Sequence, residues 1–287
     1  MIFSKQKAYA KVNLFLKVLG KSSDGYHDII SLVDIISLHD EIEFSFEKSN
    51  RKKIEVEFFP KRSYKNNTVE RAASLFFDET SFRGKLSVKV RKNIPEGAGL
   101  GGGSSDAAET LKFLAKIFRV ERKTLEKIGK KVGMDVNLFL FNSPSIIYGK
   151  GEMVHPVKIK SERFYVILYP GIKSETAKVY REYDRICGED APVPLCVFFS
   201  DYTLKEVLSV AGFNDLEEPF INLYHPQIQG IDNGFWVTGS GSCFVRLFEN
   251  RADAERIYKR LKDKSNKKCK IFMANSVFSK NWNRLYR

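Results

Sequence analysis

Cysteine is scarce in this chain, and its few cysteines follow no recognisable pattern. Cys187, Cys196, Cys243 and Cys269 form neither a C-x-x-C pair nor a closely spaced framework. A structural zinc site or a disulfide-rich secreted domain needs such spacing, so the sequence favours neither class. We therefore predict reduced thiols and a cytoplasmic protein.

Long apolar runs are also missing. No segment approaches the roughly 20 apolar residues that span a bilayer, so we expect no membrane partner. The first 21 residues, "MIFSKQKAYAKVNLFLKVLGK", lack acids, as targeting peptides do. However, lysines interrupt their apolar residues, and the alternation from Tyr9 onward is typical of a β-strand.

Acidic residues are outnumbered. The chain has 48 Lys and Arg against 35 Asp and Glu, a formal net charge of +13. Such a balance favours anionic partners, which include nucleic acid, membrane surfaces and phosphorylated small molecules. The basic residues are spread along the chain, which is typical of a solvated surface, so charge alone does not choose among these partners.

Internal repeats are absent, and 287 residues suffice for two compact domains. Strands and helices are expected to alternate without a regular βαβ rhythm, which predicts an α+β fold. The polar segment "VHPVKIKSERF" predicts a boundary near residue 158, hence domains of residues 1–158 and 159–287. Periodicity predicts strands over 8–20, 29–46, 84–95, 163–171, 234–248 and 267–278, and helices over 67–79, 104–118, 122–131 and 251–264.

The most distinctive segment is "IPEGAGLGGGSSDAA" at residues 94–108, which contains five glycines between a predicted strand and a predicted helix. Gly97, Gly99 and Gly102 spell G-x-G-x-x-G, but a Rossmann site needs a second parallel strand after the helix, and another helix is expected instead. A Walker A loop needs a lysine, and this segment has none. The remaining interpretation is a different kind of phosphate-binding loop.

Glycines let successive backbone N–H groups converge on an anion, and the following helix N-terminus adds unpaired donors and partial positive charge. Ser104 and Ser105 are placed to donate hydroxyl hydrogens to phosphate or to hold a metal-bound water. Asp106 is expected to stabilise the first helical turn.

The segment "PEGAGLGGGSSDAA" closely resembles the second motif of the GHMP kinases, P-x-G-x-G-L-G-S/G-S-S-A/D-A. "AYAKVNLFLKVLGKSSDGYHDI" and "GMDVNLFL" resemble the branch of that superfamily that acts on a cytidine diphosphate-linked polyol. "ETAKVY", "NDLE" and "VTGSGSCFV" extend the resemblance over nearly the whole chain.

The resemblance implies a two-domain GHMP kinase fold, with a ribosomal-S5-like N-terminal half and a ferredoxin-like C-terminal half. It implies transfer of the γ-phosphate of ATP, with Mg²⁺, to the C2 hydroxyl of 4-diphosphocytidyl-2-C-methyl-D-erythritol in non-mevalonate isoprenoid biosynthesis. The positive charge would suit these polyanionic substrates, and no nucleic acid partner is expected.

The resemblance also assigns the phosphate-transfer residues. ATP would bind the loop formed by Pro95, Glu96, Gly97, Ala98, Gly99, Leu100, Gly101, Gly102, Gly103, Ser104 and Ser105. Asp135 would be the base that accepts the proton of the substrate hydroxyl, and Lys11 would pair with Asp135 and stabilise transition-state charge. On the residues alone, a helix N-cap is an alternative role for Asp135, and an exposed strand lysine is the default interpretation of Lys11.

The acceptor would contact Asn13, Tyr26, His27, Thr176 and Tyr180. His27 would read the cytosine edge, while Tyr26 and Tyr180 would stack on the ring. A second glycine turn, Gly239, Ser240 and Gly241, would close against the phosphates. On the residues alone, Tyr26 and His27 are turn residues and "TGSGS" is a loop.

Three residues depart from the family pattern, and no metal ligands are assigned. Met134 replaces Ala or Ser, Asn137 replaces proline, and Asn66 replaces an aspartate. Two rival functions stay open: a kinase of another small alcohol, such as homoserine or mevalonate, and a non-enzymatic S5-like RNA-binding protein. The aromatic residues argue against the first, since small alcohols have no ring to stack, and the glycine loop and Asp135 argue against the second.

Overall fold

The computed structural model describes residues 1–64, 67–187, 201–228, 231, 234–264 and 269–277. The elements of the first part of the chain are β1 (Ile2–Lys21), β2 (His27–Lys48), β3 (Lys53–Phe59), α1 (Thr68–Thr80), β4 (Gly84–Arg91), α2 (Gly102–Phe118), α3 (Arg122–Val132), α4 (Val136–Phe141), β5 (Ser145–Gly149), β6 (Met153–Pro156) and β7 (Lys158–Ile159). Those of the second part are β8 (Phe164–Tyr169), α5 (Thr176–Cys187), β9 (Asp201–Tyr202), α6 (Leu204–Val210), β10 (Phe213–Asn214), α7 (Glu217–Tyr224), β11 (Trp236–Val237), β12 (Phe244–Phe248), α8 (Arg251–Lys264) and β13 (Lys270–Asn275).

Two main sheets organise the described residues. The first is seven-stranded, with the order β10-β1-β2-β4-β3; in addition β5 pairs with β2, and β6 pairs with β5. The second is four-stranded, with the order β11-β12-β8-β13, and a short pair joins β7 to β9. The mixture of helices and strands confirms the α+β prediction. The predicted boundary near residue 158 stays a prediction. Strand β10 of the second part pairs with β1, so the seven-stranded sheet contains strands from both sides of that position.

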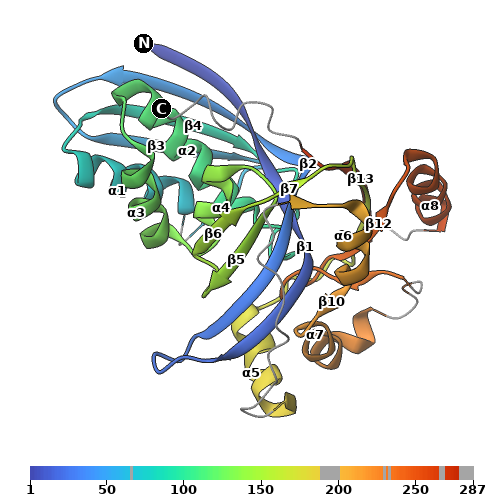
Figure 1. The fold of residues 1–287 in the computed structure, drawn as a ribbon. Coiled ribbons are helices and arrows are strands. Elements are labelled where there is room, and N and C mark those ends of the chain that lie inside the picture. Colours follow the sequence, from blue (N-terminus) through green and yellow to red (C-terminus); the bar gives the residue numbers. More distant parts are fainter. Residues whose placement is uncertain (65–66, 188–200, 229–230, 232–233, 265–268, 278–287) are drawn as a thin grey trace.

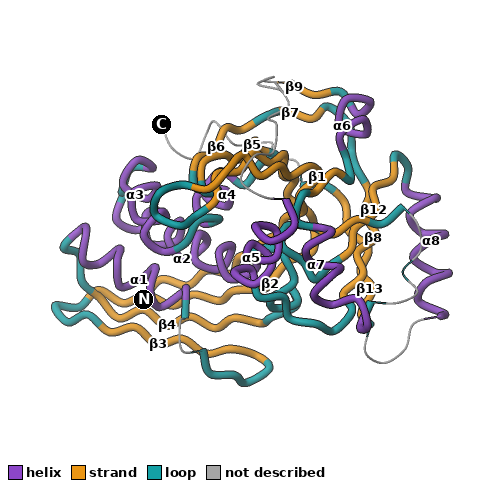
Figure 2. The backbone as a smooth tube through the Cα atoms, turned by 90° about the horizontal axis from the view of Figure 1, so that it is seen from below, coloured by secondary structure: helices purple, strands orange, loops and turns teal. Residues whose placement is uncertain are grey.

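Helices α1, α2 and α3 cover one face of the seven-stranded sheet (Figures 1 and 2). Alternation buries Leu86, Val88 and Val90 of β4, and these residues pack in one core with Phe76 and Phe77 of α1. Full burial of each such side chain stabilises the fold by roughly 1.5–3 kcal/mol. This packing holds the helices on the sheet, and the glycine loop leads from β4 into α2.

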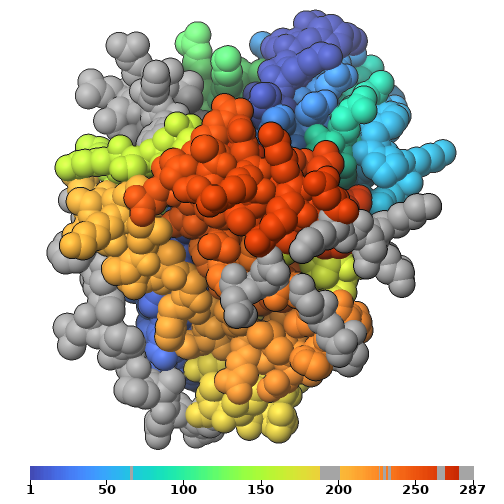
Figure 3. Space-filling model, turned by 90° about the vertical axis from the view of Figure 1, so that its right-hand side faces the viewer, coloured from blue at the N-terminus to red at the C-terminus, as the bar shows by residue number. Residues whose placement is uncertain are grey.

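Helix α8 lies on the outer side of the four-stranded sheet, where it contacts β8, β12 and β13 (Figures 2 and 3). A second core holds Tyr165, Ile167 and Trp236 of the later strands together with Val12 and Leu14 of β1. This shared core fixes the four-stranded sheet against the first sheet. Within the described residues, no helix combines the length and apolar character needed to cross a membrane.

Strand β1 contributes to both cores along its length. Its register with β2 shifts between Tyr9 and Ala10 and again between Asn13 and Phe15. Val12 and Leu14 pack in the second core, whereas Ala8, Leu16 and Val18 pack in the first. Lys11 and Asn13 alternate with Val12 and Leu14 and so point away from the second core. The Lys11 N–H donates to the Leu100 carbonyl oxygen of the glycine loop at 3.0 Å.

Most predicted elements are present, and their ends differ by up to six residues; residues 267, 268 and 278 of the last predicted strand lie outside the described residues. One prediction is wrong: residues 234–248 form two strands, β11 and β12, and not one. The break falls at Gly239 and Gly241, whose φ values of 60° and 82° are left-handed and end a strand.

Candidate active site

The glycine loop between β4 and α2 has a backbone that only glycine adopts easily. Gly97, Gly99 and Gly101 have φ values of 62°, 77° and 72°. A Cβ at Gly99 would lie 2.3 Å from the Thr238 carbonyl oxygen, and one at Gly101 would lie 2.7 Å from Cζ of Phe139. Gly101 is also the N-cap of α2 and supplies no side-chain cap, so the first N–H groups of the helix are left for a ligand.

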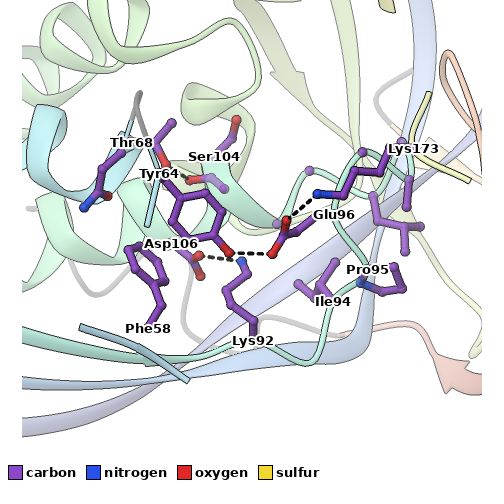
Figure 4. A pocket seen from close by; sticks show the side chains of 18 residues that line it. Phe58, Tyr64, Thr68, Lys92, Ile94, Pro95, Glu96, Ser104, Asp106 and Lys173 are labelled. Atoms are coloured by element: carbon purple, nitrogen blue, oxygen red, sulfur yellow. Dashed lines mark hydrogen bonds and ion pairs between the residues drawn. The ribbon is translucent and has the colours of Figure 1, made fainter. Parts of the chain in front are cut away.

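The loop forms the wall of a cavity of about 450 Å³ (Figure 4). This size is in the range of small-molecule sites. The lining comprises loop residues 94–104 and side chains from other segments: Phe58, Tyr64, Asn67, Thr68, Lys92, Asp106 and Lys173. We call this the nucleotide cavity, after the ligand that the resemblance implies.

A second cavity of about 180 Å³ adjoins the same loop. Gly97, Gly99 and Gly101 line both cavities, so a single stretch of main chain contributes to the wall of each. The other lining residues of this second cavity, which we call the acceptor cavity, are Lys11, Asn13, Ile29, Asp135, Ile147, Ser174, Thr176, Tyr180, Ser240 and Gly241.

Lys11 and Asp135 both line the acceptor cavity, but the expected direct ion pair is not formed. Lys11 is buried, and its Nζ donates a 2.6 Å hydrogen bond to Asn13 Oδ1. Across the described part of the chain, ion pairs within 4.0 Å do not include Lys11 with Asp135. Burial lowers the pKa of Lys11, and the negative charge of Asp135 offsets part of that effect. The two groups therefore interact across the cavity.

Asp135 precedes α4 at its N-cap position, yet its side chain accepts no capping hydrogen bond. The alternative role as a helix cap therefore fails. The carboxylate is left to face the acceptor cavity, where it can accept a proton from an incoming hydroxyl.

Asn13 holds Lys11 and connects the two parts of the chain. Its Nδ2 donates to Ser31 Oγ at 2.8 Å, and its backbone N–H donates to Thr238 Oγ1 at 2.8 Å. Trp236 Nε1 donates to the Asn13 carbonyl oxygen at 3.1 Å. Asn13 thus orients the ammonium group of Lys11 as well as lining the cavity.

The predicted base-recognition residues are only partly brought together. Tyr180 and Thr176 line the acceptor cavity, whereas Tyr26 and His27 of the β1–β2 turn do not. The His27 ring stacks on Tyr180 with centroids 4.7 Å apart, and its Nε2 lies 2.5 Å from Asp184 Oδ1.

Tyr26 is 56% exposed, and the Lys150 ammonium lies 5.1 Å from its ring centroid. This exposure leaves the Tyr26 ring accessible at the β1–β2 turn.

The second glycine turn packs on the glycine loop, and its expected closure against the phosphates stays a prediction. The Cys243 N–H donates to the Ala98 carbonyl oxygen at 3.1 Å. Ser240 shares a 2.8 Å hydrogen bond with Thr176, and its carbonyl oxygen accepts one of 2.6 Å from Ser174 Oγ. At Gly239 a Cβ would lie 3.2 Å from Lys11 Nζ, so this glycine gives the lysine its space.

Sequence reasoning missed the role of Asp106. It does not stabilise the first helical turn: its Oδ2 accepts a 2.7 Å hydrogen bond from Lys92 Nζ, which also donates to Asp40. Burial raises the pKa of Asp106 to about 7, the negative charge of Asp40 adds to this effect, and the charge of Lys92 opposes it. Burial opposes the charge of Lys92, but the two acids outweigh it and raise the pKa of Lys92. The only sequence signal for Lys92 was its place just before the loop.

The two serines of the loop differ in placement. Ser104 lines the nucleotide cavity. Ser105 is buried, does not line that cavity, and its Oγ has no hydrogen-bond partner. Ser104 is therefore the better placed of the two for a phosphate.

Two of the three departures from the family pattern lie beside Asp135. Asn137 is 3% exposed, and its Nδ2 donates to the Glu152 carbonyl oxygen at 3.4 Å. A Cβ at Gly129 would lie 2.2 Å from Asn137 Oδ1, so Asn137 packs α4 against α3 and does not line the acceptor cavity. Met134 is partly buried, and Asn66 lies outside the described residues.

The fold and the two cavities define a GHMP kinase, an ATP-dependent small-molecule kinase. Residues 67–149 match the family of GHMP kinase N-terminal domains. A crystal structure of a mevalonate kinase, 16% identical, has the same fold with a TM-score of 0.66 over 97% of this chain and 100% of that chain.

Other relatives are more specific. The 4-diphosphocytidyl-2-C-methyl-D-erythritol kinase of Thermodesulfovibrio yellowstonii is 33% identical over 88% of this chain and 92% of its own length. That of Thermotoga maritima is 34% identical over 84% and 90%. A crystal structure of 4-(cytidine 5'-diphospho)-2C-methyl-D-erythritol kinase, 28% identical, superposes with a TM-score of 0.76 over 96% of this chain and 100% of that chain. The chain belongs to the 4-diphosphocytidyl-2-C-methyl-D-erythritol kinase family.

Proposed function

We propose that this chain transfers the γ-phosphate of ATP to the C2 hydroxyl of 4-diphosphocytidyl-2-C-methyl-D-erythritol, releasing ADP and the 2-phosphate. The observation that supports it best is the glycine loop common to the nucleotide and acceptor cavities. A triphosphate bound along this loop would point its terminal phosphate toward the acceptor cavity. In-line transfer needs this juxtaposition more than it needs covalent help from the protein.

Asp135 would accept the proton of the attacking hydroxyl as the oxygen–phosphorus bond forms and the bond to ADP breaks. Lys11, buried beside Asn13, would face the negative charge that develops on the transferred group. Because Asn13 Oδ1 fixes the ammonium group, little reorganisation is needed during transfer.

Mg²⁺ would enter with the nucleotide. We expect the ion to be held mainly by phosphate oxygens and water. Ser104 at the cavity wall offers one hydroxyl oxygen, so the donor set fits such an ion. When bound, the ion would supply positive charge to the phosphate oxygens.

The cytidine end of the acceptor would contact Thr176 and Tyr180 and extend toward Tyr26 and His27 at the β1–β2 turn. Tyr180 offers a ring on which the base can stack. If Thr176 and His27 hydrogen-bond to the base edge, an acceptor without a base would leave these polar groups unpaired and would bind less well. A cytoplasmic location and the absence of nucleic acid partners stay predictions from the sequence.

The proposal is tested by ADP release from purified protein with Mg-ATP and a panel of acceptors. We expect turnover with the cytidine compound and little with homoserine or mevalonate. Preferred turnover of homoserine or mevalonate would refute the substrate assignment. In the same assay, Asp135→Asn is expected to lower kcat by about 10²- to 10⁴-fold while both ligands still bind. A near-normal kcat would remove Asp135 as the base.

A further inference from the structure

The glycine loop itself carries no lysine or arginine, but a lysine from the second part of the chain lies against it. Lys173 stands in the segment between β8 and α5 and lines the nucleotide cavity. The Ser174 N–H donates to the Gly97 carbonyl oxygen at 2.8 Å. A Cβ at Gly97 would lie 3.1 Å from Lys173 Cβ, so the two segments touch along their main chains. Lys173 is thereby tethered beside the phosphate-binding backbone.

The ammonium of Lys173 is held by a carboxylate of the loop. Lys173 Nζ lies 3.0 Å from Glu96 Oε2. Glu96 Oε1 accepts hydrogen bonds from Arg62 Nη1 at 2.7 Å and from the Tyr64 hydroxyl. Figure 4 shows the Glu96 carboxylate between the Tyr64 hydroxyl and the Lys173 ammonium. One acid at the wall of the cavity thus binds two cations.

The charges around Glu96 suggest an exchange of partners. Burial favours the neutral acid, but Tyr64, Lys173 and Arg62 outweigh it and lower the pKa of Glu96, so the group is ionised at neutral pH. The Glu96 side chain is 20% exposed and the Lys173 side chain 65%. Because the Lys173 side chain is already mostly exposed to water, separating it from Glu96 costs little free energy. A triphosphate brings more negative charge than one carboxylate and competes for the same cation.

We propose that Glu96 holds Lys173 at the nucleotide cavity until ATP binds, and that the terminal phosphates then take the Lys173 ammonium from Glu96. Lys173 would contact the nucleotide directly, and Glu96 would be a positioning residue. This inference rests on the proposed ATP site. It has an unusual consequence: neutralising Glu96 should strengthen ATP binding, because the phosphates would no longer compete with a carboxylate.

The test measures the Kd of ATP and of AMP, without acceptor, by isothermal titration calorimetry. Glu96→Gln is expected to tighten ATP binding, and Lys173→Met to weaken it, each by a factor of about two to five, the size typical of an exposed ion pair. AMP binding should change little in either variant, since AMP lacks the terminal phosphates. The double variant should lose the gain given by Glu96→Gln, and added salt should shrink both effects.

A matched ion pair outside the cavity provides controls. Lys178 lies 2.6 Å from Glu175, and its side chain is 50% exposed. Lys178→Met and Glu175→Gln change the net charge by the same amounts and should leave both Kd values unchanged. Tyr64→Phe removes one hydrogen bond to Glu96 without a change of charge. Unfolding midpoints of all variants check that the fold is intact.

A purely structural role for Glu96 predicts the opposite sign. If Glu96 served only to anchor Arg62 and Tyr64, Glu96→Gln would weaken ATP and AMP binding alike, and that result would overturn the proposal. An unchanged ATP Kd in Lys173→Met would also overturn it. The expected pattern of nucleotide affinities without turnover of the cytidine compound would refute the acceptor assignment alone. Failure of the wild type to bind ATP would refute both.

Discussion

Asp40 and Asp106 share Lys92 at the nucleotide cavity, but their surroundings are unequal. Asp40 also accepts backbone N–H bonds from Asn93 and Ile94 at 2.5 and 2.8 Å. Asp106 has Lys92 alone, and its Oδ1 is buried without a hydrogen-bond partner. A buried carboxylate with one unpaired oxygen is costly when ionised. Burial of this carboxylate is the main cause of its raised pKa, and the negative charge of Asp40 adds to it.

This asymmetry predicts a pH-dependent stability that Asp106→Asn should remove. The pKa of Asp106 rises from an ordinary 3.8 to about 7 in the folded state, so the folded state binds more protons than the unfolded state between those values. The contribution of Asp106 is therefore fully favourable below about pH 4 and is lost as the pH rises through 7. Asp106→Asn stays neutral and still offers Lys92 an oxygen.

We expect Asp106→Asn to have a higher free energy of unfolding than the wild type at pH 8, with the difference shrinking toward pH 4. Urea denaturation between pH 4 and 8 measures it. Glu57→Gln, on the exposed side of β3, serves as the control and should leave the pH profile unchanged. Parallel profiles for Asp106→Asn and the wild type would contradict the prediction.

At the scale of elements, the glycine loop depends on left-handed backbone conformations that residues with a side chain rarely adopt. Gly99→Ala would force a left-handed residue, at a cost of about 1–2 kcal/mol, and would also place its Cβ 2.3 Å from the Thr238 carbonyl oxygen. We expect lower stability and weaker ATP binding, because the loop and the second glycine turn must separate.

Gly103→Ala provides the contrast, since Gly103 is helical and its added Cβ would meet only Thr68 Oγ1, at 3.4 Å. This change should leave the unfolding midpoint equal or higher, as helical Gly→Ala changes gain up to about 1 kcal/mol. Differential scanning fluorimetry compares the two variants. Equal destabilisation by both would show that the left-handed backbone is not the cause.

Periodicity predicted the helices α1, α2, α3 and α8 well, because each has a continuous apolar face. It did not predict the register shifts between β1 and β2, because a single strand's sequence does not encode the register of its partner. The single strand predicted over 234–248 is wrong for a different reason: it ran through the glycine turn at Gly239 to Gly241, which the resemblance had already marked within that range.

At the scale of the whole molecule, a buried ion pair joins the two main sheets. Arg163 precedes β8, and its Nε and Nη2 donate to the two carboxylate oxygens of Asp34 on β2 at 2.7 and 3.0 Å. The Tyr165 hydroxyl donates to the same carboxylate at 2.5 Å. All three residues are fully buried. The pair thus holds the first sheet against the second.

Asp34→Ala should be strongly destabilising, by about 3–5 kcal/mol, because it leaves the Arg163 charge buried without its carboxylate. Guanidinium denaturation measures the change. Glu43→Ala breaks the exposed pair between Lys5 and Glu43 and should have no measurable effect. A small effect of Asp34→Ala would mean that water or another group replaces the carboxylate.

The resemblance singled out the glycine loop, Lys11 and Asp135, and these residues line one cavity; their roles stay predictions. It did not indicate Lys92, Tyr64 or Lys173. These side chains reach the nucleotide cavity from a strand end, a loop and the second part of the chain, and only tertiary packing brings them together. The stacking of His27 on Tyr180 was equally beyond the sequence, because it depends on how α5 meets the β1–β2 turn.

The main chain from Gly97 to Gly101 serves two neighbouring chambers at once. A molecule that linked an adenosine polyphosphate to a cytidine-bearing polyol through one short tether would engage both chambers together. Once one end is bound, the other end would be present at a high effective concentration. Such a bisubstrate compound should therefore bind with a far lower Kd than either half alone.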